Sequence, residues 1–273
     1  MRVNYNPQIL PELYYFNNTM EVPFTVNATD LHPILDVTFD GVHIMDGDIV
    51  SPSPMISITL KDEDKIKFTE NPDDIQIFRR YRGEDGNETP AFEQITLGAN
   101  GADIQFFKGD LKNPARIEYN PKNLADGVYE LQVQGRDVSG NLSGKEMYSI
   151  TFRVINESTI THFYPYPNPF TTSTRFVFTL TGSVIPKDMK IQIMTVTGKV
   201  VREIMGSELG PIRIGNNTSA YSWDGTDEFG DKLANGVYLY RVVIDHGPDE
   251  MKHRRTSADK AFKNNWGKLY ILR

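Results

Sequence analysis

One short pattern occurs twice in this chain, and it constrains the fold more than any other feature. Leu124 to Val133 reads LADGVYELQV, and Leu233 to Val242 reads LANGVYLYRV. Each copy is a polar turn that ends in glycine and leads into a run with the alternation of a β-strand. A turn and strand repeated about one domain length apart indicates two related β-domains in tandem.

Length, charge and cysteine content narrow the class of protein. The chain has 273 residues, 39% of them hydrophobic and 24% charged, which suits two globular domains of ordinary size. No apolar run approaches the ~20 residues that a membrane-spanning helix needs. The net charge of −7 argues against a dedicated nucleic-acid binder, because phosphate binding favours a basic face. The sequence contains no cysteine, which excludes disulfides and thiol nucleophiles.

Short alternating strands separated by turn signals dominate residues 31–156. Asp40-Gly41 predicts a tight hairpin turn, since glycine supplies the positive φ that a type I′ turn needs, and Val42 to Ile44 resumes the strand pattern. The expected strands are Ile34–Phe39, Ile56–Leu60, Ile75–Tyr81, Ile104–Phe107, Ala115–Tyr119, Gly127–Gln134 and Tyr148–Val154. Such a series of short strands predicts an immunoglobulin-like sandwich.

Residues 160–273 carry a second set of strands, after a short junction at Asn156 to Ile160. Tyr164 to Phe170 reads YPYPNPF, and its prolines favour an extended backbone. Further strands are expected at Thr174–Leu180, Lys190–Thr195, Lys199–Ile204, Gly236–Val243 and Gly267–Arg273. The predicted fold class is therefore all-β, with two tandem immunoglobulin-like β-sandwich domains. Residues 1–30 are expected to form a linker or the tail of a preceding domain, with a strand, turn and strand at Tyr14 to Val26.

The motifs of residues 160–273, taken in order, resemble a known family. They are Pro-Asn-Pro, Trp-Asp-Gly, Asn-Gly-Val-Tyr and a closing GKLYILR. This order resembles the C-terminal sorting domains of the type IX secretion system, and it is similar to the immunoglobulin-like domain of flagellar hook-capping proteins. The residues that carry the sorting motif are Pro167, Asn168, Pro169, Trp223, Asp224, Gly225, Gly236, Tyr238, Gly267 and Lys268.

The first domain extends the resemblance. Its stretch LDVTFDGVHIMDGDIVSPSP resembles the domain before this tail in large gingipain-like cysteine peptidases and in the sortase of the same pathway. This implies a non-catalytic C-terminal part of a longer surface protein of Bacteroidetes-type bacteria, exported through the outer membrane to an extracellular or cell-surface location. The implied partner is the outer-membrane secretion or anchoring machinery, and we expect a monomer or weak oligomer.

Two features depart from the family pattern. The charged stretch Asp245 to Asn265 separates the last strand from the one before it, where sorting domains keep this connection short. The peptidase's catalytic cysteine has no counterpart here, so no catalytic role can be assigned by resemblance. We expect no enzyme activity, because the histidines are scattered and no glycine-flanked serine forms a nucleophile elbow. The histidines are His32, His43, His162, His246 and His253.

An acidic loop is a candidate calcium site. Asp224, Asp227, Glu228 and Asp231 lie close together in the sequence, and calcium binds several oxygen ligands, although this spacing does not match an EF-hand loop. The favoured interpretation is that the acids are turn residues with solvated carboxylates. No other cofactor is expected.

Loop aromatics and a basic run leave alternatives open. Tyr81, Phe107 and Trp223 would serve an adhesion or carbohydrate-binding module as platforms for sugars, whereas Trp223 is more simply explained as a core anchor. A basic run would contact anionic lipopolysaccharide or an acidic partner, or would form a solvated insertion, which is the favoured interpretation. The run comprises Lys252, His253, Arg254, Arg255, Lys260, Lys263 and Lys268.

Overall fold

The structure, a computed structural model, describes residues 31–62, 68–97, 103–244, 252–253 and 266–273. The regular elements in these ranges are β-strands and two 3₁₀ turns, η1 (Pro72–Asp74) and η2 (Gly206–Glu208). The predicted all-β class is confirmed. No helix in the described ranges has the length and apolar character to cross a membrane.

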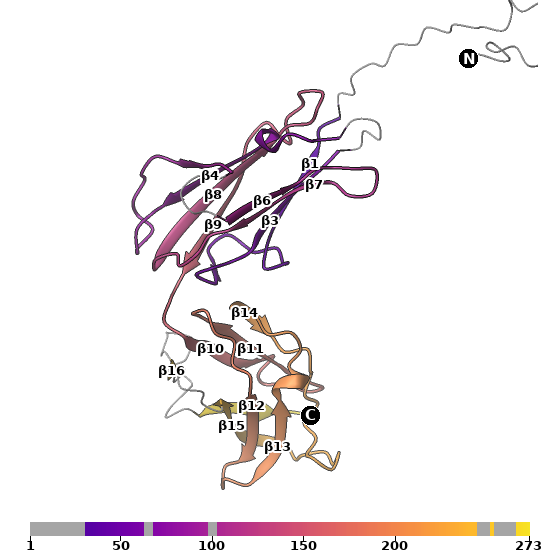
Figure 1. Cartoon of the computed structure of the whole chain (residues 1–273). Helices are drawn as coiled ribbons and strands as arrows, with labels where there is room; N and C mark the ends of the chain where they lie inside the picture. The colour runs from indigo at the N-terminus through magenta and orange to yellow at the C-terminus, as the bar shows by residue number, and fades with distance from the viewer. Residues whose placement is uncertain (1–30, 63–67, 98–102, 245–251, 254–265) are drawn as a thin grey trace, which may run out of the picture. The chain divides into compact units, whose positions relative to one another are not determined.

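The first sandwich contains strands β1 to β9 (Figure 1). One sheet has the order β1-β3-β7-β6, and the other has the order β2-β9-β8-β4-β5, with β2 parallel to β9. The bounds are β1 Ile34–Phe39, β2 Asp48–Val50, β3 Ile56–Lys61, β4 Ile75–Tyr81, β5 Glu93–Ile95, β6 Asp103–Phe107, β7 Ala115–Asn120, β8 Gly127–Gly135 and β9 Tyr148–Val154. This order matches the A-B-E-D and G-F-C-C′ sheets of an immunoglobulin domain.

The core of the first sandwich follows from side-chain alternation. Successive residues of a strand point to opposite faces, so Ile56, Ile58 and Leu60 of β3 are buried while Ser57 and Thr59 are only half-buried. They pack with apolar residues of the facing sheet in a single buried cluster.

The second sandwich contains strands β10 to β17 and has its own core. One sheet has the order β14-β11-β10-β16, and the other has the order β13-β12-β15-β17. The bounds are β10 Thr159–Tyr166, β11 Arg175–Leu180, β12 Met189–Thr195, β13 Val200–Met205, β14 Gly215–Thr218, β15 Gly236–Ile244, β16 Lys252–His253 and β17 Gly267–Ile271. At the centre of the core, the Phe163, Phe176 and Tyr240 ring centroids lie 5.6–5.7 Å apart.

The repeated pattern occupies the same place in both sandwiches. β8 and β15 each pair with the last strand of their sandwich, β9 and β17. The Tyr129 hydroxyl donates to Ala125 O at 3.2 Å, and the Tyr238 hydroxyl donates to Ala234 O at 3.0 Å. A tyrosine near the start of strand F that bonds back to the preceding turn is the tyrosine corner of immunoglobulin-like domains. The structure therefore confirms the two related β-domains.

Several local predictions can be compared with the structure. Asp40 and Gly41 have φ of 49° and 79°, which confirms the tight turn, but Val42 forms only an isolated bridge to Phe39 and the predicted strand does not resume there. The predicted junction before Ile160 is partly wrong, because β10 already begins at Thr159. Strands β2, β5, β10, β14 and β16 were not predicted, and of β10 only its end was expected to be extended. The expectations for residues 1–30 lie outside the described residues.

Candidate functional site

The residues that resemble the sorting motif gather around β17. This strand lies at the edge of its sheet, next to β15, and an edge strand has a row of backbone groups without a neighbouring strand. The motif segments that meet it come from three distant parts of the chain.

Asn168 and Phe170 bond the outer edge of β17. Asn168 Nδ2 donates to Lys268 O at 2.9 Å, and Asn168 Oδ1 accepts from Tyr270 N at 2.9 Å. Phe170 N donates to Tyr270 O at 3.1 Å, and Leu272 N donates to Phe170 O at 2.9 Å. The Pro-Asn-Pro segment thus takes the place of a neighbouring strand.

The flanking prolines hold Asn168 in a defined backbone. Both Tyr166-Pro167 and Asn168-Pro169 are cis peptide bonds, and each proline fixes its own φ. Pro167 O accepts a hydrogen bond from the Thr174 hydroxyl at 2.8 Å. The segment is therefore bonded to β17 on one side and to the entry of β11 on the other.

Arg273 joins the Trp-Asp-Gly loop to the end of β17. Its backbone N donates to Asn235 Oδ1, and Asn235 Nδ2 donates to its backbone O, both at 2.9 Å. Its guanidinium donates to the carbonyls of Leu233 (3.0 Å), Gly225 (3.2 Å) and Asp224. Gly225 has φ of +76°, which favours glycine, and a Cβ there would lie 2.6 Å from Arg273 Nη2, so the end of that side chain would have to shift.

Trp223 is a core anchor. Its side chain has no exposed surface, its ring lies 5.6 Å from that of Phe170, and its Nε1 donates to Thr226 O at 2.9 Å. Its backbone exchanges two hydrogen bonds with Thr174, each 2.9 Å. The alternative of a sugar platform is wrong for Trp223, because the ring is not accessible.

The remaining motif residues shape the strand pair β15–β17. Gly236 and Tyr238 lie opposite Ile271 and Leu269, and Tyr238 forms the tyrosine corner. Gly267 is buried against the ring of Tyr240, with which any Cβ would overlap.

The acidic loop is built as two successive turns. Asp224 Oδ1 accepts from the Thr226 hydroxyl at 2.7 Å and from Thr226 N at 3.2 Å, and the hydroxyl bond is the main reason that the pKa of Asp224 is lowered. Asp227 Oδ1 accepts from Phe229 N at 2.9 Å and from Asp231 N at 3.0 Å.

The first sandwich contains a turn of the same kind. Asp227 can therefore be explained by turn structure alone. Asp137 Oδ1 accepts from Asn141 N at 2.7 Å, and Gly140 N donates to Asp137 O at 3.1 Å. In the acidic loop, Gly230 N donates to Asp227 O at the same distance. These bonds are what an aspartate at the start of a turn commonly makes.

Glu228 faces a cation of the neighbouring strand. Its carboxylate accepts from Arg202 Nη1 at 3.2 Å and also from the backbone N of Glu203. Nowhere in the part of the chain that the structure describes do three or more His, Cys, Asp or Glu side chains form a group that could hold a metal ion. Calcium binding by the acidic loop stays a prediction. Of the basic run, only Lys268 has a described side chain, and it is exposed.

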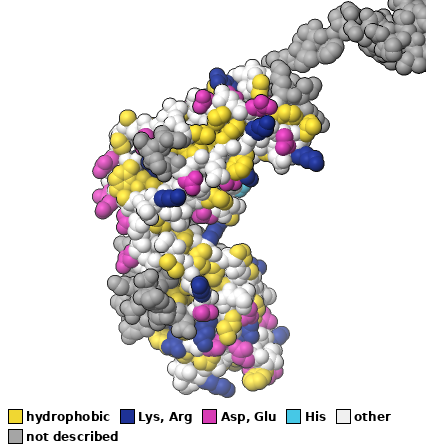
Figure 2. All heavy atoms as spheres, viewed as in Figure 1, with side chains coloured by type: hydrophobic (Ala, Val, Ile, Leu, Met, Phe, Trp, Pro, Cys, Tyr) yellow, Lys and Arg dark blue, Asp and Glu magenta, His cyan; other side chains and the backbone are white. Residues whose placement is uncertain are grey.

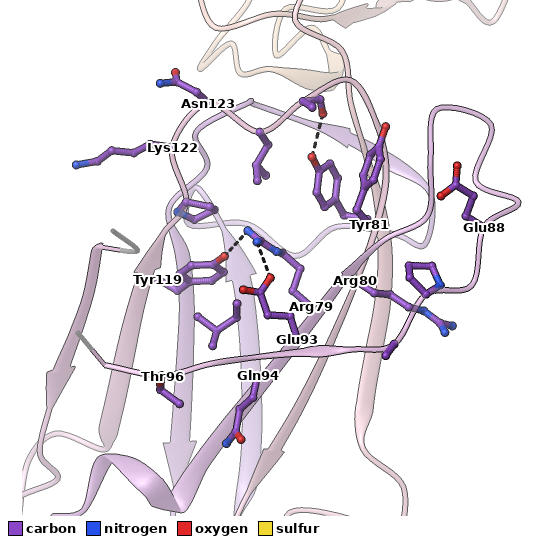
Figure 3. Close-up of a pocket in the computed structure, with 17 residues that line it drawn as sticks. Arg79, Arg80, Tyr81, Glu88, Glu93, Gln94, Thr96, Tyr119, Lys122 and Asn123 are labelled. Carbon is purple, nitrogen blue, oxygen red and sulfur yellow. Dashed lines mark hydrogen bonds and ion pairs between the residues drawn. The ribbon is translucent and has the colours of Figure 1, made fainter. Parts of the chain in front are cut away.

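A separate cleft of about 680 Å³ lies in the first sandwich (Figure 3). Arg79 is at its centre and donates to the Tyr119 hydroxyl at 2.8 Å and to Glu93 Oε2 at 3.3 Å. Tyr81 lines one wall, with its ring 5.0 Å from that of Tyr129. Burial raises the pKa values of Tyr119 and Tyr129. Sequence reasoning identified only Tyr81 here.

One sequence signal does point to this cleft. Ile75 and Ile77 are the buried residues of β4, and Arg79 occupies the next position on the same inward face. A cation at an inward position needs polar partners, which Tyr119 and Glu93 provide. The third proposed platform, Phe107, lies elsewhere, half-exposed under the Arg116 guanidinium at 4.5 Å.

Charged side chains of both signs are interspersed over the face of the molecule seen in Figure 2. Ion pairs among the described residues include Arg80 with Glu130 at 2.7 Å and Lys190 with Glu203 at 3.0 Å. These pairs lie across neighbouring strands, where opposite charges stabilise the pairing of the strands.

Comparisons with known proteins give structural likeness alone. No family model matches the chain, and no curated protein gives a significant match. Among solved structures, the chain is similar to dimeric latent PorU from Porphyromonas gingivalis, with 19% identity, a TM-score of 0.32, and coverage of 89% of this chain and 20% of that one. The chain therefore spans about a fifth of the length of that PorU chain.

Two modular proteins give similar results. The fibronectin(III)-like modules of Clostridium thermocellum CbhA match with 12% identity and a TM-score of 0.24, over 86% of this chain and 94% of that one. The D00-D0 domain of intimin matches with 13% identity and a TM-score of 0.24, over 88% of this chain and all (100%) of that one. Every TM-score is below 0.5, so the immunoglobulin-like fold rests on the strand order of the sandwiches themselves.

Proposed function

We propose that this chain is a non-catalytic C-terminal module of an exported surface protein, and that residues 160–273 direct its sorting by the type IX secretion machinery and its attachment to the cell surface. One observation carries the proposal. The segments that resemble the sorting motif, Pro167 to Pro169, Trp223 to Gly225 and Gly236 to Tyr238, all contact β17 or the residues that follow it.

The hydrogen bonds on β17 favour one mode of recognition. A partner could either add a strand to an open edge or bind a folded surface. On the outer edge of β17, Lys268 O, Tyr270 N and Tyr270 O already have partners in Asn168 and Phe170. We therefore favour recognition of the folded surface, where Tyr166 is 69% exposed beside the bonded edge.

A reporter enzyme fused ahead of the whole chain tests this function in a bacterium with the pathway. The reporter should become accessible to protease on the surface of intact cells. Deletion of residues 267–273 should retain it in the periplasm, and Asn168→Ala should lower the surface fraction severalfold. Asn113→Ala is the matched control, because Asn113 bonds only within its own loop, to Asp110.

A periplasmic reporter with the unmodified chain would refute the sorting role. If Asn168→Ala and Asn113→Ala reached the surface equally, the folded Pro-Asn-Pro surface would not be the signal. Thermal unfolding of each purified variant separates loss of recognition from loss of the fold.

A further inference from the structure

The cleft around Arg79 has the composition of a ligand site that the sorting role does not use. It lies between β4, β5 and the loop that leads from Tyr119 to Tyr129, entirely within the first sandwich (Figure 3). Its volume of about 680 Å³ falls in the range of pockets that bind small ligands.

Polar groups converge at the base of the cleft. Tyr119 is 1% exposed, and its hydroxyl accepts a hydrogen bond from Arg79, so it fixes the position of the guanidinium and is itself covered. The Glu93 carboxylate bonds Arg79 through one oxygen, and its side chain is 55% exposed. The base therefore offers a planar cation and a carboxylate acceptor within reach of one another.

The walls and rim complement these groups. Tyr81 is half-buried and, with Leu124 and Pro121, gives the cleft apolar surface. The rim carries amide and hydroxyl side chains, among them Gln94 and Thr96 along the lower edge in Figure 3. Apolar patches between short polar groups suit a ligand that has both ring faces and hydroxyls.

The lining carries no excess of positive charge. Arg79 lies among two acids, Glu88 and Glu93, and Lys122 pairs with Asp103, which does not line the cleft, at 3.6 Å. Arg80 is paired outside the cleft, because it donates to Glu130 at 2.7 and 2.9 Å, and Figure 3 shows it pointing away. A lining without an excess of cations does not favour polyanions, which gain their affinity from such an excess.

Peptide addition is also disfavoured by the geometry. A peptide would extend the sheet at β5, but β5 is only three residues long, so few backbone hydrogen bonds would form. We propose that the cleft binds a neutral, hydroxyl-rich oligosaccharide, with Arg79 and Glu93 bonding vicinal hydroxyls, Tyr119 holding Arg79 in position and Tyr81 contacting a sugar ring.

A screen of the whole chain against an array of neutral and acidic glycans tests the proposal, followed by calorimetric titration with the best soluble oligosaccharide. Arg79→Lys keeps the charge but loses the planar fork, and it should weaken binding tenfold or more. Tyr119→Phe removes one hydroxyl and should weaken binding severalfold.

The matched controls lie in the same sandwich. Tyr148→Phe removes a tyrosine hydroxyl from β9, and Arg136→Lys alters an arginine whose partner is Asp74; neither residue lines the cleft. Both controls should bind like the unmodified chain. No binding to any neutral glycan, binding confined to acidic glycans or peptides, or equal affinity in Arg79→Lys would each overturn the proposal. Thermal unfolding checks that Arg79→Lys is folded.

Discussion

The two sandwiches secure their last strand in similar ways. In the first, β2 pairs parallel with β9, and Asp46 Oδ1 accepts from Thr151 N at 2.7 Å. In the second, Asn168 bonds β17, and Phe170 forms a parallel bridge with Ile271. Each sandwich thus covers the edge of its last strand with an earlier segment of its own, which blunts that edge against unwanted pairing.

The turn before the repeated strand is used in both sandwiches as well. Asp126 Oδ1 accepts from Asn156 N at 2.6 Å, and Asn235 Oδ1 accepts from Arg273 N at 2.9 Å. Asn156 and Arg273 each lie two residues after the last strand of their sandwich. In both sandwiches, the chain just after the last strand is therefore hydrogen-bonded to the turn before the repeated strand in the same way.

The differences show how two similar sandwiches come to have different surfaces. The short side chain of Asn156 donates to Leu124 O at 3.0 Å and to Asp126 Oδ1 at 2.6 Å, both in the adjacent turn, whereas the long side chain of Arg273 extends to the Gly225 loop. At the other edge of the sheet, β5 has three residues and β13 has six. The shorter strand covers less of the space between the sheets, and the cleft lies beside it. The long side chain of Arg273 thus gives the second sandwich a hydrogen-bonded surface, and the short strand β5 leaves an open cleft in the first.

Truncation of Trp223 should have the largest effect and should be confined to one sandwich. Trp223→Ala removes a fully buried ring, which costs about 3–5 kcal/mol of unfolding free energy. Hydrogen exchange should show faster opening of β11 and β17, with β3 of the first sandwich unchanged. Equal loss of protection in both would show that the sandwiches do not have independent cores. Phe107→Ala, at a half-exposed ring, is the control for loss of an aromatic side chain.

A pair of glycine substitutions measures the contact with Arg273. Gly225→Ala and Gly230→Ala both place a side chain at positive φ, which costs roughly 1–2 kcal/mol. Only at Gly225 would the Cβ also meet other side chains, those of Arg273, Ile271 and Phe170, so Gly225→Ala should lose about 1 kcal/mol more. Urea denaturation of the two variants provides the comparison. Equal losses would mean that these side chains move away without cost.

Asn168→Ala tests the cover over β17. It removes two hydrogen bonds to the strand backbone, each worth about 1 kcal/mol. We expect a loss of about 2 kcal/mol, with faster hydrogen exchange at Tyr270. Asp46→Ala makes the related change in the first sandwich and should speed exchange at Thr151. A variant with unchanged exchange at Tyr270 would contradict the role of Asn168.

The smallest expected effect is a dependence on acid pH in the second sandwich. The Thr226 hydrogen bond lowers the pKa of Asp224 below its ordinary value of 3.8, so the folded state favours the carboxylate. This stabilisation is complete above about pH 3.8 and is lost as the pH falls through the lower folded pKa. Asp224→Asn should flatten the acid side of a melting-temperature profile, and an unchanged profile would contradict the assignment.

Much of the fold could be predicted from local patterns. Alternation gave β1, β4 and β9 with their bounds, and Asp40-Gly41 marked a hairpin turn, because both signals depend only on neighbouring residues. Strands β2, β5, β14 and β16 were missed, since two to four residues are too few to show a period. Strand β10 has eight residues but was missed, because Pro165 and the prolines that follow it indicated only an extended segment.

The candidate sites could be predicted only in part. The motif residues were identified as a set, and Trp223 was expected in the core, but their convergence on β17 depends on contacts such as Asn168 with Lys268, 100 residues apart. The cleft depends on Arg79 meeting Tyr119, 40 residues later. Contacts at such separations are fixed by strand order and leave no local pattern in the sequence.

The hydrogen bonds between Asn168 and β17 can form only late in the synthesis of the chain. During synthesis, the Pro-Asn-Pro segment emerges about 100 residues before the strand that it bonds, so its partners do not yet exist. The surface formed by both comes into being only when the second sandwich has closed. A receptor for that surface would bind only completely synthesised and folded molecules, and not nascent or truncated ones. The same contact would therefore both direct sorting and select for folded protein.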